Sequence, residues 1–180
     1  MNPIELARQH ARRLHDESVQ RGRDPWSPYE FAVGIANDLG ITVETCAPGA
    51  ALLDGGRATF DPDLPLIVHE TGGSPFDQAF LVAHEIGHAE LGDGEEGPEP
   101  AAQIDPTRTS EAAPVGMDRV VDYSRRQRRE VQMDLFAREL LLPRTVALDL
   151  HVVQGQMCSK IAARLGAPFE VVAQQMLDAL

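Results

Sequence analysis

Two histidines and a glutamate in the segment His84-Glu85-Ile86-Gly87-His88 form the pattern with the clearest chemistry in this chain. On an α-helix, residues four positions apart lie on one face, so His84 and His88 can direct both imidazoles at one ion. Glu85 lies one position along, beside that ion. This H-E-x-x-H spacing is typical of a Zn²⁺ site in which two nitrogens bind the metal and a carboxylate acts on a metal-bound water. The sequence therefore predicts a zinc centre here.

A catalytic zinc ion needs a third protein ligand, because the motif supplies only two and the fourth position is left for water. Farther along the chain, Glu130 and Asp134 are one helical turn apart and share a face. We expect Glu130 to bind the metal. We expect Asp134 to accept a hydrogen bond from the free ring N–H of a ligand histidine, which fixes the tautomer of that ring. The alternative assignment makes Asp134 the ligand.

Helices must position both groups, and the sequence contains the patterns that begin them. Three segments, which begin at Asn2, Ser27 and Ser74, each have a capping residue, then a proline, and an acidic residue three positions after the cap. A capping box also begins at Ser124. Pro143 ends the helix that carries Glu130. The expected helices cover residues 3–21, 28–39, 75–91, 124–142, 144–153, 159–165 and 168–180.

Between residues 41 and 69 the pattern changes to short β-rich runs, at 41–46, 50–53, 57–60 and 64–69. The turn residues Asp54-Gly55-Gly56 predict a hairpin between two of these runs, and Pro65 predicts that the last run is an edge strand. Gly87 is expected to let the motif helix approach the sheet closely. The expected fold class is α+β, with a small antiparallel β-sheet packed against the zinc-binding helices and a C-terminal helical segment.

The length of 180 residues fits a single domain, with a core over residues 1–150 and a C-terminal helical extension over residues 151–180. Residues 92–120 are rich in Gly, Pro and Glu and poor in apolar side chains, so we expect a mobile acidic loop there. A solvated insertion is the simpler interpretation of this loop, and a gate for substrate is the alternative.

Composition excludes some classes of function. The formal net charge of −12 argues against a surface that binds nucleic acid as a whole. No run of about eighteen apolar residues occurs, so no membrane segment is expected. Cys46 and Cys158 form no C-x-x-C pair, which favours reduced thiols and a cytoplasmic protein.

The two motifs together resemble the ImmA/IrrE family of zinc metallopeptidases. H-E-I-G-H at residues 84–88 is followed by E-V-Q-M-D-L-F-A-R-E-L-L-L-P at residues 130–143. The family's second motif is typically E-x-x-A-N-x-F-A-x-x-L-L-x-P. This chain departs from it at Met133 and at Asp134, and the aspartate makes the pair more similar to thermolysin-type gluzincins. The resemblance covers roughly residues 27–143.

By resemblance, His84, His88 and Glu130 are zinc ligands and Glu85 is the general base. The resemblance implies a regulatory, selective endopeptidase that hydrolyses a protein partner, such as a transcriptional repressor in a stress or DNA-damage response. Peptide hydrolysis also needs a donor for the tetrahedral oxyanion, and His69, Tyr123 or a nearby arginine are the candidates.

A non-proteolytic domain is the competing hypothesis, either a metal-binding sensor or an interaction domain associated with a DNA-repair helicase or a transcription regulator. Positive charge at a helix N-terminus opposes the helix dipole, so the basic cluster of the predicted helix 124–142 is a candidate contact for DNA or an acidic partner. A solvated face paired with the acidic loop is the simpler interpretation. The cluster consists of Arg125, Arg126, Arg128 and Arg129.

The C-terminal helices have the spacing of a helix-turn-helix, with Ala162, Gly166 and Val172 at the expected places. The would-be recognition helix, residues 168–180, contains no Lys or Arg, whereas phosphate contacts need cations. A packing module that closes the core or docks a partner is therefore the favoured interpretation.

Overall fold

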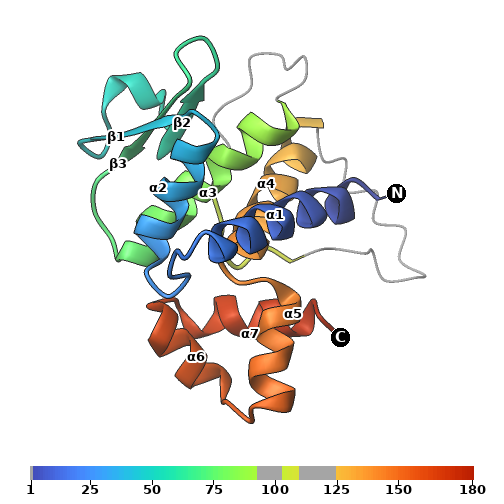
Figure 1. Cartoon of the computed structure of the whole chain (residues 1–180). Coiled ribbons are helices and arrows are strands. Elements are labelled where there is room, and N and C mark those ends of the chain that lie inside the picture. The colour runs from blue at the N-terminus through green and yellow to red at the C-terminus, as the bar shows by residue number, and fades with distance from the viewer. Residues whose placement is uncertain (1, 93–102, 110–124) are drawn as a thin grey trace.

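The computed structural model describes residues 2–92, 103–109 and 125–180 (Figure 1). The chain has an α+β fold in which helices dominate, and its described part contains one three-stranded sheet. The helices of the main body are α1 (Pro3–Gln20), α2 (Pro28–Asp38), α3 (Pro75–Leu91) and α4 (Arg125–Leu141). The strands are β1 (Thr42–Cys46), β2 (Ala58–Asp61) and β3 (Leu66–Glu70). The C-terminal helices are α5 (Arg144–Leu148), a π-helical turn (Asp149–Val153), α6 (Cys158–Leu165) and α7 (Phe169–Leu177).

Local capping fixes the starts of α1 and α3, whereas Ser27 makes no side-chain capping bond at the start of α2 and Ser124 lies outside the described residues. The Asn2 side chain accepts a hydrogen bond from the backbone N–H of Ile4 at 3.0 Å. At the start of α3 the Ser74 hydroxyl accepts from the N–H of Asp77 (3.1 Å) and the Asp77 carboxylate accepts from the N–H of Ser74 (2.8 Å), which is a complete capping box. These bonds satisfy backbone N–H groups that have no partner within the helix. The start of the helix that carries both histidines is therefore fixed by its own sequence.

The sheet is mixed, and the prediction of an antiparallel sheet is wrong in this respect. Its strand order is β1-β3-β2, with β3 antiparallel to β2 and parallel to β1. The predicted strand 50–53 is absent, because Ala51–Leu53 forms a 3₁₀ turn and Asp54 is left-handed. The chain therefore passes from β1 to the opposite edge of the sheet before the β2–β3 hairpin places β3 in the centre.

Pro65 does not mark an edge strand, because it immediately precedes the central strand β3. Its carbonyl accepts a hydrogen bond from the N–H of Thr42 at 2.9 Å. The N–H that proline lacks falls at the strand start, where no ladder bond is required. The prediction of an edge strand from Pro65 is therefore wrong.

Helix α3 lies at the centre of the molecule, where it packs against α2, α4 and strands β2 and β3 (Figure 1). Its side chains are buried almost continuously from Phe76 to Gly87, which includes both His84 and Glu85. Removal of these apolar side chains from water is the main contribution of α3 to the stability of the fold. Helix α1 covers α4 on its other side. The metal motif therefore begins in a buried stretch of α3.

Gly87 faces α4, and the expectation that it faces the sheet is wrong. A Cβ atom at this position would lie 2.8 Å from Met133 Sδ and 3.1 Å from Phe136 Cδ1. Only glycine allows α3 and α4 to approach so closely here. This contact brings the helix of His84 and His88 against the helix of Glu130.

Residues 103–109, which we call the strap, are held against α4. The prediction that the whole of residues 92–120 is a mobile loop is therefore wrong for this segment. Ile104 packs against the hydrophobic core. Arg138 Nη1 donates to the carbonyls of Pro106 (3.2 Å) and Arg108 (2.6 Å). The remainder of the predicted loop, with its acidic cluster, lies outside the described residues.

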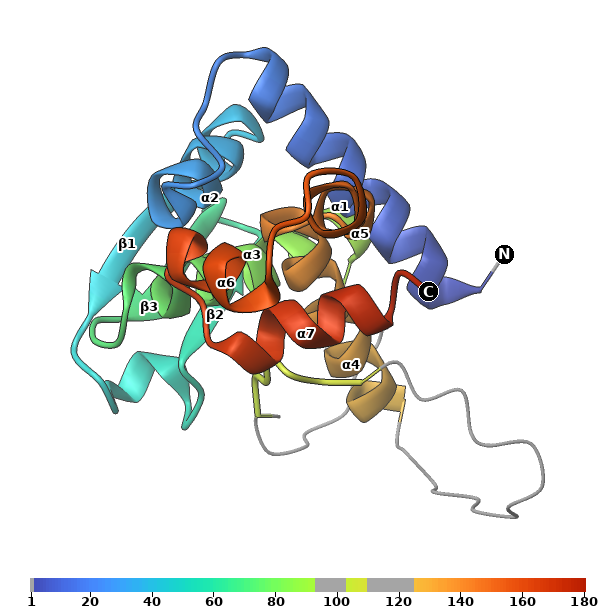
Figure 2. The ribbon, with the colours of Figure 1, turned by 90° about the horizontal axis from the view of Figure 1, so that it is seen from below.

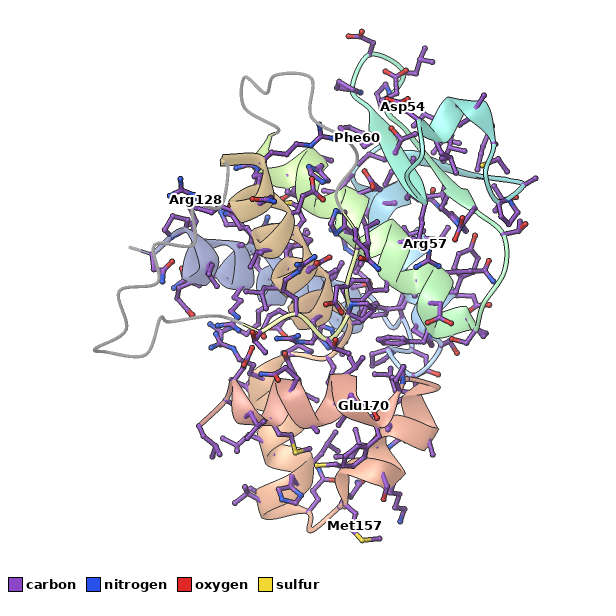
Figure 3. The ribbon with its side chains drawn as sticks, turned by 180° about the vertical axis from the view of Figure 1, so that it is seen from behind. Asp54, Arg57, Phe60, Arg128, Met157 and Glu170 are labelled. Carbon is purple, nitrogen blue, oxygen red and sulfur yellow. The ribbon has the colours of Figure 1, made fainter. Side chains whose placement is uncertain are left out.

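The C-terminal helices form a lobe at one end of the molecule, and Figure 2 shows α6 and α7 in front of α3 and α4 in the view from below. Figure 3 shows Met157 at the tip of this lobe and Glu170 on α7. Helix α7 buries Val171, Val172 and Gln175. These contacts favour a packing role for the predicted helix-turn-helix. Among the described residues, no helix combines the length and the apolar character that crossing a membrane requires.

Candidate metal centre

Three side chains from α3 and α4 converge at the close approach of the two helices. His84 Nε2 lies 3.1 Å from Glu130 Oε2 and 3.2 Å from His88 Nε2, and His88 Nε2 lies 3.7 Å from Glu130 Oε1. Each residue offers one ligand atom, and these atoms lie within 4.8 Å of one another. His84, His88 and Glu130 therefore form a group that could hold a metal ion.

The separations fit a tetrahedral ion of the size of zinc. Ligand nitrogens and oxygens lie roughly 2.0–2.1 Å from zinc, so the edges of the tetrahedron are about 3.3 Å long. The two histidine nitrogens are 3.2 Å apart, and each lies 3.1 or 3.7 Å from one of the two Glu130 oxygens, which is close to this value. Two nitrogens and one carboxylate oxygen are also a donor set that zinc accepts, with the fourth position left for water.

Asp134 fixes the ring of His84 from behind. It is fully buried, and its Oδ1 lies 3.0 Å from His84 Nδ1. Because carboxylates only accept, Nδ1 carries a hydrogen toward Asp134, and in the metal-free chain Nε2 carries one toward Glu130, where a metal ion would take its place. The structure thus brings Asp134 to the position that the sequence predicted, with Glu130 and not Asp134 in the group of converging donors.

Hydrogen bonds decide the charge of His84. Burial alone disfavours the charged ring, but the hydrogen bonds with Asp134 and Glu130 outweigh burial and raise the pKa of His84 to about 10. The same pairing outweighs the effect of burial on Glu130 and lowers the pKa of that carboxyl. The centre therefore favours positive charge, and a divalent cation that displaces the proton meets the same requirement.

The strap completes the surroundings of Asp134, which sequence reasoning missed. Asp134 Oδ2 accepts hydrogen bonds from Arg108 Nε (2.8 Å) and from the backbone N–H of Asp105 (3.2 Å). The available signal was the turn sequence Asp105-Pro106-Thr107 inside an otherwise featureless segment, because aspartate before proline favours turn initiation. Nothing in the sequence indicates that this turn reaches α4.

Glu85 lies on α3 between the two histidines and is 5% exposed. Its negative charge contributes to the raised pKa of His84, which places it in the electrostatic environment of the ligands. A buried carboxylate one residue from a ligand histidine is the arrangement expected for a general base.

His69 is not available to stabilise an oxyanion in this arrangement. It is fully buried in β3, with Nδ1 2.9 Å from the carbonyl of Glu70 and Nε2 3.0 Å from the hydroxyl of Tyr29. Nδ1 therefore donates to the carbonyl and Nε2 accepts from Tyr29, so both nitrogens are in use. The second candidate, Tyr123, lies outside the described residues.

The predicted arginine cluster is divided between different surroundings. Arg129 Nη2 donates to the carbonyl of Leu91 at 2.7 Å and so caps the end of α3. Arg126 is half-buried and its charge helps to lower the pKa of Glu130, whereas Arg128 is exposed. The side chain of Arg125, at the start of α4, is outside the described part. Contact of this cluster with DNA or an acidic partner stays a prediction.

Cys46 and Cys158 are free thiols, as predicted.

No protein-family model matches the chain, and no curated protein matches it. The resemblance to the ImmA/IrrE family therefore stays an expectation that rests on the two motifs.

Proposed function

We propose that this chain is a zinc-dependent endopeptidase that hydrolyses a peptide bond of a protein partner. The observation that carries the proposal is the convergence of His84, His88 and Glu130, with Asp134 bonded to the outer nitrogen of His84. Glu85, on the same helix as the histidines, would complete the reaction centre. Following the ImmA/IrrE resemblance, we expect a cytoplasmic, selective enzyme whose substrate is a protein such as a transcriptional repressor in a stress or DNA-damage response.

When bound, zinc supplies a water with a pKa of about 7 and a Lewis acid for the scissile carbonyl. Glu85 would act as the general base, taking one proton from the attacking water as the C–O bond forms and delivering it to the amine nitrogen as the C–N bond breaks. Asp134 keeps the His84 lone pair directed at the centre throughout. Glu130 supplies the negative charge that two neutral histidines lack.

Cleavage by the zinc-loaded chain, with Glu85→Gln as its matched variant, tests this function. Glutamine keeps the size of glutamate but does not act as a base, so the variant should bind one zinc per chain and cleave about 100-fold more slowly or worse. The measurement is mass spectrometry of new N-termini in total protein from the native host, beside elemental analysis of both proteins. Equal cleavage by the variant contradicts the proposal.

A non-proteolytic metal-binding sensor is the second candidate, and the enclosure of the centre favours it. The side chains of His84 and His88 are only 1% and 12% exposed, and Glu85 is 5% exposed. A closed centre of this kind suits a metal that stabilises a conformation. A zinc-loaded wild-type chain that yields no new N-termini would favour this candidate.

A further inference from the structure

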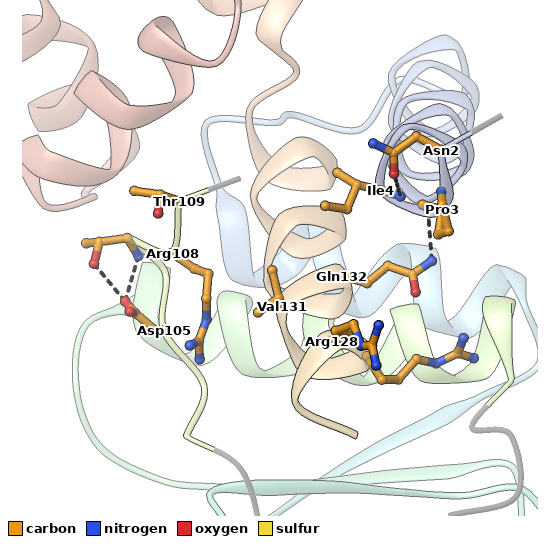
Figure 4. Close-up of a pocket in the computed structure, with 11 residues that line it drawn as sticks. Asn2, Pro3, Ile4, Asp105, Arg108, Thr109, Arg128, Val131 and Gln132 are labelled. Carbon is orange, nitrogen blue, oxygen red and sulfur yellow. Dashed lines mark hydrogen bonds between the residues drawn. The ribbon is translucent and has the colours of Figure 1, made fainter. Parts of the chain in front are cut away.

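A cavity of about 800 Å³ lies against α4, and none of the three candidate metal ligands lines it. Its walls are residues 2–4 at the start of α1, residues 105 and 107–109 of the strap, and residues 128, 129, 131 and 132 of α4. Figure 4 shows the start of α1 and the strap on opposite sides of α4, with Val131 between them. The volume falls in the range of roughly 300–1,000 Å³ that small-molecule sites occupy.

The cavity combines apolar surface with polar groups. Pro3, Ile4 and Val131 provide apolar surface, and Thr107 and Thr109 add hydroxyl groups. Apolar walls with few polar groups are the usual composition of a ligand pocket, since burial gives affinity and the polar groups fix orientation.

Positive charge outweighs negative charge at the walls. Three guanidinium groups, those of Arg108, Arg128 and Arg129, line the cavity together with one carboxylate, that of Asp105. The Asp105 carboxylate already accepts from the N–H (2.9 Å) and the hydroxyl (2.7 Å) of Thr107. The chain as a whole has a net charge of −12, so this local excess of cations stands against the field of the molecule.

Arg128 is the cation that can receive a ligand. Arg108 is bonded to Asp134 (2.8 Å) and to the carbonyl of Gln103 (2.6 Å), and Arg129 is bonded to the carbonyl of Leu91. Arg128 is exposed and forms no ion pair or hydrogen bond within the described part of the chain. It lies near the N-terminus of α4, where the helix dipole adds partial positive charge. A guanidinium in this position attracts an anion without first giving up a partner among the described residues.

We propose that this cavity binds a small organic anion, with a carboxylate or phosphate on Arg128 and an apolar body against Val131 and Ile4. A small molecule fits better than a nucleic acid, because three arginines around a mainly apolar pocket make a small footprint for a phosphate backbone. The site uses no metal ligand and would bind its anion in the metal-free chain. The proposal therefore goes beyond peptidase activity and can fail or succeed independently of it.

Titration of the ¹⁵N-labelled, metal-free chain with 4-phenylbutyrate, phenyl phosphate and 4-phenylbutyramide tests the proposal. The two anions should shift the backbone amides of Ile4, Thr107 and Val131 together and saturably. The uncharged amide should bind about tenfold more weakly, a difference of about 1.4 kcal/mol, because it cannot form the charge-assisted hydrogen bond. A difference between the two anions distinguishes a carboxylate site from a phosphate site.

Two variants locate the binding. Arg128→Ala should weaken both anions about tenfold and leave the amide unchanged, whereas Val131→Glu should weaken all three probes. Arg12→Ala, which removes the same charge from α1, should change nothing. Circular dichroism verifies that each variant is folded. Absence of saturable shifts with both anions at millimolar concentration overturns the proposal, as does equal binding of the amide or an equal effect of Arg12→Ala.

Discussion

At the scale of the residue, Asp134 joins the candidate metal centre to the rest of the molecule. One of its oxygens holds His84 at 3.0 Å, and the other accepts from Arg108 and from the N–H of Asp105. Both oxygens of this buried carboxylate are therefore engaged by hydrogen-bond donors. It therefore orients the ring of His84 without competing for the metal.

Substitution of Asp134 distinguishes this orienting role from direct ligation. Asp134→Ala should weaken zinc binding by about 10–100-fold, which is the usual effect of losing a carboxylate behind a ligand histidine. Asp134→Asn should bind zinc more tightly than the alanine variant, because the amide oxygen can still accept from His84 Nδ1. The measurement is competition with a chromophoric chelator.

Glu130→Ala is the matched control, since it removes a ligand and should abolish stoichiometric zinc binding. If Asp134→Ala loses zinc completely while Glu130→Ala retains it, the two roles are reversed.

At the scale of the element, the distance between α3 and α4 decides whether the three donor atoms meet. Gly87 sets this distance, because any Cβ there would meet Met133 and Phe136 at 2.8 and 3.1 Å. Helix packing elsewhere tolerates small shifts, whereas a metal site requires its ligands within a few tenths of an ångström. Packing and metal affinity are therefore coupled at this crossing.

Gly87→Ala should lower the free energy of unfolding by about 1–3 kcal/mol, the typical effect of overpacking a core, and should also weaken zinc binding. Adding Met133→Ala removes the nearest atom and should recover part of both losses, which is a non-additive effect of residues in contact. Chemical denaturation and zinc competition measure the two quantities. Additive losses in the double variant would contradict this account of the contact.

A second prediction at this scale concerns the ends of α1 and α2, which are joined by Asp38 with Arg23 and Arg21. The hydrogen bond from Arg23 is the main reason that the pKa of Asp38 falls from 3.8 to about 2. A carboxyl with a lowered pKa stabilises the folded chain above its unfolded pKa, and this contribution is lost as the pH falls from about 4 towards 2.

Denaturation of the wild type and of Asp38→Asn should therefore converge across this pH range. High salt should reduce the difference at neutral pH, because the arginines are partly exposed. A constant difference down to pH 2 would exclude this ion pair as its source.

At the scale of the whole molecule, buried charges attach the C-terminal lobe to the metal-binding body. Asp178 Oδ2 accepts from Arg138 Nη2 (2.6 Å) and Arg8 Nη2 (2.5 Å), and Arg138 Nε donates to Gln175 Oε1 (2.9 Å). The same Arg138 holds the strap through two carbonyls. One guanidinium thus connects α4, α7 and the strap.

Asp178→Ala should destabilise the chain by about 3–5 kcal/mol, because it leaves the buried charges of Arg138 and Arg8 without their carboxylate. Asp149→Ala, which removes an exposed carboxylate from the same lobe, should change stability by less than about 0.5 kcal/mol. Chemical denaturation of both variants measures the effect. Equal stability of the two variants would show that the lobe is held by apolar contacts alone.

The sequence predicted the features that local chemistry decides. The starts of α1 and α3 follow from Asn2 and Ser74 because capping acts within a few residues. The pairing of Glu130 with the histidines was predictable from helical spacing in two motifs. The parallel pairing of β1 with β3 was not, since it depends on a connection with a 3₁₀ turn. The strap was missed for the same reason: its bonds to Asp134 and Arg138 join residues far apart in sequence.

Arg108 connects the two proposed sites, because it lines the cavity on α4 and also donates to Asp134, which holds His84 of the candidate metal centre. Sites that share a side chain are thermodynamically linked, so the factor by which an anion changes zinc affinity must equal the factor by which zinc changes anion affinity. An anion bound by Arg128 adds negative charge near the metal centre, which favours a bound cation, so we expect the linkage to be positive. The occupancy of each site would then rise with the concentration of the other ligand, so the doubly bound chain would form mainly when metal and anion are both present.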